Sequence, residues 1–188
     1  MSLMLLGVLN AQAAGGDLSA YDLLETTTLS SSASSVTFSG LDSYTDYKHL
    51  QVRMVLRGTN SNVNDSVNVR LNGNTSSGSR THRILASGSS VISDANSAGT
   101  NAINLGAMPA ATASANLFSP FVMDLLDFAS VAKNPVLKTF CGNLAATQVG
   151  LYSGLLVNTS AVTSIQFSTL NASFAANSRF SLYGIKGA

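Results

Sequence analysis

Apolar and polar residues alternate along most of the chain from Tyr21 onward, in short runs separated by polar turns. A period of two places alternate side chains on one face of a half-buried β-strand. The clearest run extends from Tyr47 to Arg57. In this run we expect four side chains to face a core: Leu50, Val52, Met54 and Leu56.

A second regular run, Ser66 to Leu71, is followed by Asn72-Gly73, a strong hairpin signal. Its side chains Val67, Val69 and Leu71 should face inward. The segment from Ser87 to Ala115 has the least pattern and predicts a long loop with one short strand near Ile103 to Leu105. Further strands are expected at Tyr21 to Leu29, Ser35 to Ser39, Thr81 to Ala86, Phe121 to Phe128, Val136 to Gly142, Gly150 to Val157, Ser164 to Thr169 and Phe180 to Ile185.

Short strands at regular spacing without helical segments predict an all-β protein, an antiparallel jelly-roll-like β-sandwich. An immunoglobulin-like sandwich is less well supported, because the chain has one cysteine and no tryptophan. No internal repeat supports a propeller or a solenoid. We expect one sandwich body over residues 17–188, preceded by an extended N-terminal arm over residues 1–16.

The arm is apolar and carries no charged residue. Its apolar run and the following Ala11-Gln12-Ala13 imitate a secretory signal, but no Lys or Arg precedes the run. The run is also far shorter than the about 20 apolar residues that cross a bilayer, so we expect no membrane partner. We expect the arm to anchor the chain to a partner or a second copy. The alternative is an arm folded back on its own core. The anchoring residues would be Leu3, Met4, Leu5, Leu6, Val8 and Leu9.

Composition narrows the class of protein. Only 10% of the residues are charged, against about 25% in an ordinary domain, and the net charge is +1. Long surface helices depend on charged helix formers and are therefore nearly excluded. Neutral balance also argues against nucleic-acid binding, which usually requires a strongly basic surface.

Candidate catalytic chemistry is sparse. His49 and His82 lack further ligands at a spacing that would bind a metal. Asp124 and Asp127 are three residues apart, which on a strand directs them to opposite faces. Cys141 has no partner for an internal disulfide and is expected to be a small buried apolar residue. We therefore expect no enzyme activity, no cofactor and no metal site.

The basic residues are unevenly placed. If the strand assignments hold, Arg53, Arg57 and Arg70 project from one outer sheet face. Such a patch could dock an acidic protein or an anionic polysaccharide, because guanidinium groups pair well with carboxylates. The alternative is a solvated face that protects against aggregation.

Several stretches resemble a known family. The stretches are residues 1–16 with 20–29, Ser35 to Leu41, Tyr47 to Arg53, and Arg179 to Lys186. They are similar to small virion structural proteins of tailed phages, of the head-decoration, fibre or tail-fibre type. The resemblance implies a jelly-roll-like virion component on the head exterior or the tail, assembled as a trimer. It supplies no active-site residues.

The expected function is therefore a phage virion structural protein on the particle exterior, a decoration, cement or fibre subunit anchored by its arm. A low-charge sandwich with an apolar arm is typical of a subunit that shares its stability with neighbouring copies. Its expected partners are other capsid or tail proteins and further copies of the chain. The first alternative is a tail fibre or receptor-binding module that contacts a host surface glycan. A secreted carbohydrate-binding module comes next, and a glycan hydrolase last.

Overall fold

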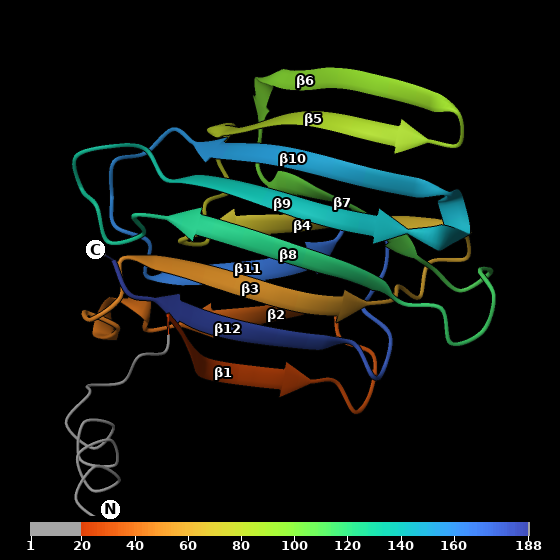
Figure 1. Cartoon of the computed structure of the whole chain (residues 1–188), viewed down its shortest axis with the longest axis horizontal. Coiled ribbons are helices and arrows are strands. Elements are labelled where there is room, and N and C mark those ends of the chain that lie inside the picture. The colour runs from red at the N-terminus through yellow and green to blue at the C-terminus, as the bar shows by residue number, and fades with distance from the viewer. Residues whose placement is uncertain (1–19, 188) are drawn as a thin grey trace, which may run out of the picture.

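The computed structural model describes residues 20–187 and is built almost entirely of β-strands (Figure 1). Two antiparallel sheets face each other as a sandwich. The described residues contain no α-helix, only the short 3-10 turns η1 (Leu41–Ser43) and η2 (Leu144–Ala146). The prediction of an all-β, antiparallel, jelly-roll-like sandwich is confirmed.

The larger sheet has eight strands, and its first and last described elements lie together at one edge. In spatial order they are β1 (Tyr21–Thr28), β12 (Arg179–Ile185), β3 (His49–Leu56), β8 (Ser119–Leu126), β9 (Val136–Asn143), β10 (Gln148–Leu156), β5 (Ser79–Ser87) and β6 (Ser90–Thr100). The smaller sheet consists of β2 (Ser35–Ser39), β11 (Ser164–Thr169), β4 (Asn64–Leu71) and β7 (Ile103–Pro109).

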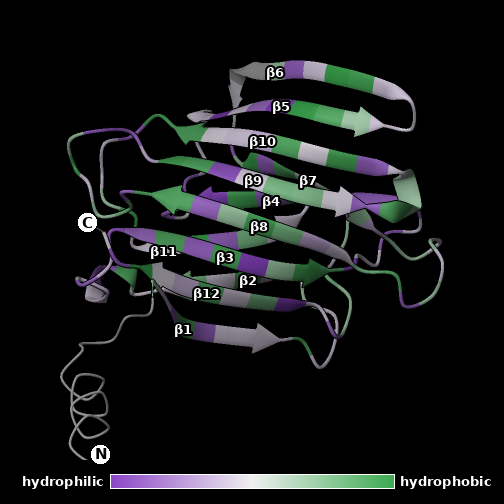
Figure 2. Ribbon diagram, in the orientation of Figure 1, coloured by the Kyte–Doolittle hydropathy of each residue, from purple (hydrophilic) through white to green (hydrophobic). Residues whose placement is uncertain are grey.

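The alternation on β3 and β4 has the consequence expected from the sequence. On β3, every second side chain from Leu50 to Leu56 is buried. On β4, Val67, Val69 and Leu71 are buried while Asn68 and Arg70 are partly exposed. The banded colouring of the strands in Figure 2 follows this period.

The Asn72-Gly73 turn forms as predicted, but it does not close a hairpin. Both residues have a positive φ, 54° and 60°, which this dipeptide adopts readily. However, β4 belongs to the smaller sheet and the next strand, β5, belongs to the larger one. The turn therefore carries the chain from the smaller sheet to the larger one. The Asn72 side chain forms hydrogen bonds with the segment before β11.

The prediction of a long loop from Ser87 to Ala115 is wrong, although the one short strand expected near Ile103 to Leu105 is confirmed by β7. This segment contains β6 and β7, and β6 pairs with β5 through a turn at Gly88 and Ser89. An edge strand packed against no opposite sheet needs no alternating apolar residues, so its sequence of Ser, Ala, Asn and Gly lacks the usual signal.

The core lies between the two sheets and is centred on aromatic rings. The ring centroids of Phe167 and Phe180 are 5.6 Å apart, and those of Phe174 and Phe180 are 5.1 Å apart. Phe38 meets Phe167 edge to face at 6.3 Å. All four side chains are fully buried.

The larger sheet is wider than the smaller one, and its additional strands extend past one edge of the smaller sheet. Strand β7, an edge of the smaller sheet, packs mainly against β9 and β10. Figure 1 shows β5 and β6 extending past it. We call these two strands the overhang.

Candidate functional site

A single row of inward-facing residues crosses the larger sheet and changes from apolar to charged along its length. Each member lies opposite the next on the neighbouring strand: Leu182, Val52, Met123, Thr139, Tyr152, Arg83 and Asp94. The first five are buried. The last two lie on the overhang, beside the edge of the smaller sheet, and they form an ion pair.

The Arg83–Asp94 pair has bidentate geometry. Nε and Nη2 of Arg83 donate to the two carboxylate oxygens of Asp94, both at 2.7 Å. The paired guanidinium holds the pKa of Asp94 below its ordinary value, and the carboxylate raises the pKa of Arg83. The side chains remain 34% and 50% exposed, so the pair is fixed in geometry but accessible to solvent.

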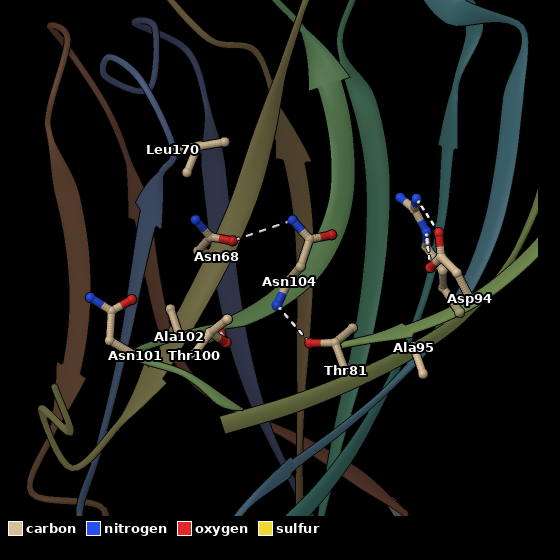
Figure 3. Close-up of a pocket in the computed structure, with 10 residues that line it drawn as sticks. Asn68, Thr81, Asp94, Ala95, Thr100, Asn101, Ala102, Asn104 and Leu170 are labelled. Atoms are coloured by element: carbon tan, nitrogen blue, oxygen red, sulfur yellow. Dashed lines mark hydrogen bonds and ion pairs between the residues drawn. The ribbon is translucent and has the colours of Figure 1, made fainter. Parts of the chain in front are cut away.

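Beside this pair lies a cavity of about 540 Å³ between the overhang and the smaller sheet (Figure 3). We call it the overhang cavity. Asn104 Nδ2 donates to Asn68 Oδ1 at 3.3 Å, and the Asn104 backbone N–H donates to Thr81 Oγ1 at 3.2 Å. The lining residues are Asn68, Thr81, Arg83, Asp94, Ala95, Thr100, Asn101, Ala102, Asn104 and Leu170.

The opposite, outer face of the larger sheet carries an apolar row in register. Val122, Phe140, Leu151 and Ile84 lie opposite one another on four successive strands. Phe140 is 56% exposed, Leu151 51% and Ile84 56%. Val149 and Val91 lie in the adjacent row of the same face, on either side of Ala86. We call these six apolar residues, Val122, Phe140, Leu151, Ile84, Val149 and Val91, the outer apolar patch.

The three arginines of the predicted docking patch do not share a face, so that expectation is wrong as to placement. Arg53 lies on β3 of the larger sheet, where its guanidinium covers the Tyr183 ring at 4.5 Å. Arg70 lies on β4 of the smaller sheet and binds the Asn101 carbonyl at 3.1 Å. The prediction placed strands 3 and 4 in one sheet, but the chain changes layers between them.

Arg57 has a structural role instead. It follows β3, and its Nη1 donates to the carbonyl oxygens of Ser114 and Leu117 at 2.8 and 3.0 Å. Its Nη2 donates to the carbonyl of Ala113 at 3.0 Å. The guanidinium therefore holds the 111–117 segment in place and has few donors left for a partner.

The predicted anchoring residues Leu3, Met4, Leu5, Leu6, Val8 and Leu9 lie outside the described residues. The anchoring hypothesis therefore stays a prediction.

Other candidate catalytic residues are held apart. Asp124 accepts a hydrogen bond from Gln51 and pairs with Lys138 at 3.4 Å. Asp127 lies beyond β8, where its backbone N–H donates to His49 Nδ1 at 2.9 Å and its carboxylate pairs with Lys133. Lys133 lowers the pKa of Asp127. Within residues 20–187, no group of three His, Cys, Asp or Glu side chains could hold a metal ion.

Cys141 is buried, as the sequence predicted. Burial raises the pKa of its thiol to about 11, which keeps the thiol protonated at neutral pH. Its sulfur packs directly against β7 of the smaller sheet, where a Cβ on Gly106 would come within 2.4 Å of it. The role of Cys141 is packing.

Sequence reasoning missed the Arg83–Asp94 pair, although a signal was present. A two-residue loop at Gly88 and Ser89 pairs residues symmetrically about itself, Ser87 with Ser90 and Arg83 with Asp94. Treating Gly88, whose φ is 58°, as a hairpin turn would have placed the two charges opposite each other.

Comparisons with known proteins give only distant similarities. No family model and no curated protein matches the chain. Exo-inulinase from Aspergillus awamori is similar at TM-score 0.44 and 10% identity, over 88% of this chain and 29% of that chain. The Caenorhabditis elegans galectin LEC-6 is similar at TM-score 0.30 and 8% identity, over 92% of this chain and 100% of that chain.

A third similar structure is the CBM2 module of the evolved Dit of Lactobacillus casei BL23 phage J-1, at TM-score 0.17 and 11% identity. It covers 88% of this chain and 78% of that chain. Likenesses this distant carry no argument about the fold or the function of this chain. In the described part of the chain, no helix is long and apolar enough to span a membrane.

Proposed function

We propose that this chain is a structural subunit of a phage virion, displayed on the particle exterior and assembled with further copies of itself. The outer apolar patch supports the part of the proposal that concerns assembly. Its side chains leave on the order of 600 Å² of apolar surface in water, at the upper end for a monomer. A standard interface buries about 800 Å² on each partner, so one patch supplies most of that area.

A second copy of the chain is the occupant we propose for this patch. Most soluble oligomers form from identical copies, so a patch of interface size most readily contacts another copy of the chain. The charge balance of the chain is nearly neutral, so copies do not repel each other strongly. The resemblance to small tailed-phage virion proteins supplies the virion setting and implies three copies.

The solution mass of the full chain tests the assembly. A trimer has three times the 19.4 kDa monomer mass. Leu151→Lys places a charge at the centre of the patch and should shift the mass to the monomer while the circular dichroism spectrum stays that of a β protein. The matched control is Val131→Lys, since Val131 is an exposed valine in the loop after β8. The control should keep the mass of the unaltered chain.

A monomeric unaltered chain at micromolar concentration would contradict this assembly, and so would an oligomer that Leu151→Lys leaves intact. The virion setting has its own test, which is mass spectrometry of purified particles. Hundreds of copies per particle indicate the head lattice, and a few multiples of three or six indicate the tail. Absence of the chain from particles would overturn the virion role.

A further inference from the structure

The overhang cavity contains polar groups that the fold uses only in part. Asn68 Oδ1 accepts from Asn104, while its Nδ2 donates to none of the residues that the structure describes. Thr81 Oγ1 accepts from the Asn104 backbone N–H, so its own hydroxyl hydrogen remains available. The ion pair holds the Arg83 guanidinium and the Asp94 carboxylate in a fixed orientation, and both groups remain accessible to solvent.

The charge in this cavity is balanced. Arg83 and Asp94 neutralise each other, and the other polar lining residues are amides and hydroxyls. A charged ligand would therefore gain little net attraction. A neutral ligand with several hydroxyl groups fits better, because each hydroxyl both donates to the carboxylate and accepts from the amide or guanidinium.

The cavity also has an apolar side and a suitable size. Leu170, beyond β11, and Ala102, between β6 and β7, line it together with the polar groups. An apolar surface beside convergent polar groups suits the C–H faces of a sugar ring. A volume of about 540 Å³ lies within the range of about 300–1,000 Å³ for small-molecule sites.

We propose that the overhang cavity binds a neutral saccharide, with Asn68 and the Arg83–Asp94 pair as its polar contacts and Leu170 as its apolar contact. The position of the site explains the residues found there. The same cross-sheet row that is apolar beneath the smaller sheet ends in a charged pair where the cover ends. Display on a virion exterior would give such a site access to host glycans, but the binding itself does not depend on that setting.

An NMR titration of the full chain tests the proposal. The probes are lactose, maltose, cellobiose and N,N′-diacetylchitobiose, with N-acetylneuraminic acid as the anionic comparison. The chain carries 13C-labelled methyl groups on Ala, Leu and Thr. At least one neutral sugar should shift the methyl signals of Thr81, Ala102 and Leu170 saturably, with a dissociation constant at or below about 10 mM. The methyl signal of Ala132, in the loop after β8, should not move.

Variants connect the shifts to the cavity. Arg83→Met should weaken sugar binding at least tenfold, about one hydrogen-bonded charged contact. Its matched control is Lys138→Met, which removes a paired cation from the outer face of the same sheet and should bind as before. Leu170→Ala should weaken binding several-fold. Leu170 is an exposed side chain, so this variant tests the site even if Arg83→Met folds poorly.

Three results would overturn the saccharide site. They are no shift at the cavity methyls with about 50 mM of any neutral sugar, shifts only elsewhere, or unchanged binding by both Arg83→Met and Leu170→Ala. Binding of N-acetylneuraminic acid alone would also reject a neutral ligand. Each result leaves the solution mass and the particle location untouched, so failure of this site is distinguishable from failure of the virion role.

Discussion

The covered part of the larger sheet and the overhang differ in what their inner faces carry. Beneath the smaller sheet, strands β12, β3 and β8 present Leu182, Val52 and Met123, all fully buried. Strands β5 and β6, which form the overhang, carry the Arg83–Asp94 pair in the same row. The side-chain period is the same in both regions. The width of the opposite sheet therefore influences which inward positions carry apolar residues, although Leu85 on β5 is also buried.

On the outer face of the larger sheet, in contrast, apolar side chains are exposed to solvent. Its exposed apolar residues concentrate on β8, β9, β10 and β5, where Phe140 faces solvent while its neighbour Thr139 is fully buried. On these strands the more apolar side chain of a pair does not always mark the core. This reversal is a reason to expect that a second copy covers the outer face.

The largest expected effect breaks the comparison between the two faces. Phe180→Ala removes a fully buried ring that contacts Phe167 and Phe174, and should lower the free energy of unfolding by about 3–5 kcal/mol. Phe140→Ala makes the same chemical change on the outer face and should cost less than about 1 kcal/mol in the monomer. Urea unfolding of both variants in the monomeric Leu151→Lys background measures the two losses. Equal losses would show that the outer face is packed.

The next effect tests how closely β7 covers β10. A Cβ on Gly154 would lie 2.4 Å from Ile103 Cγ2 and 2.9 Å from Leu137 Cδ1. Gly154→Ala should therefore destabilise the fold by about 1–3 kcal/mol through overpacking. Gly142→Ala, on the neighbouring β9, meets no atom closer than 4.0 Å and should change the thermal midpoint little. Similar midpoints for the two variants would contradict close packing at this point.

A smaller effect is expected where the inner row begins to turn polar. Thr139 is fully buried, and its hydroxyl finds no hydrogen-bond partner among the described residues. Thr139→Val keeps the shape and removes the unsatisfied group, and should raise the free energy of unfolding by about 1 kcal/mol. Thr37→Val, on the exposed face of β2, is the control and should have little effect. Destabilisation by Thr139→Val would indicate that a bound water satisfies this hydroxyl.

The smallest effect concerns the overhang and depends on pH. Arg83 holds the pKa of Asp94 below its ordinary value of 3.8, so ionised Asp94 stabilises the fold above that pH. This contribution is lost as the pH falls through the lower folded-state pKa. Asp94→Asn should therefore be slightly less stable than the unaltered chain at pH 7 and equally stable near about pH 2.

Thermal unfolding at both pH values measures this difference. Asp46→Asn, in the exposed turn before β3, is the control and should leave the midpoint nearly unchanged at each pH. A difference for Asp94→Asn that persists in acid would mean that the pair does not stabilise through its charge.

The sequence predicted the fold class and the core strands because their apolar residues alternate against a covered face. It failed where no such constraint acts. Strand β6 has almost no apolar pattern, because it is a sheet edge that no second layer covers. The arginine patch failed for a different reason, since alternation tells which residues share a strand face but not which sheet the strand joins. That information lies in the long-range pairing, as between β4 and β11.

The candidate site was harder to predict than the fold. Its residues come from β4, β5, β6 and β7 and from the segments that follow β6 and β11, and the cavity lies where two sheets of unequal width meet. Only the register of the β5–β6 hairpin was accessible from the sequence. Asn68 and Asn104, 36 positions apart, meet through the pairing of β4 with β7.

The order of the strands in the larger sheet also sets a distance. Tyr21, where the first strand begins, lies opposite Ile185 at one edge, and the overhang forms the other edge. Seven spacings of about 4.8 Å separate these edges, roughly 34 Å along the sheet. A partner that binds the molecule at its first strand therefore leaves the opposite edge accessible to solvent. Attachment and saccharide binding would then use separate surfaces.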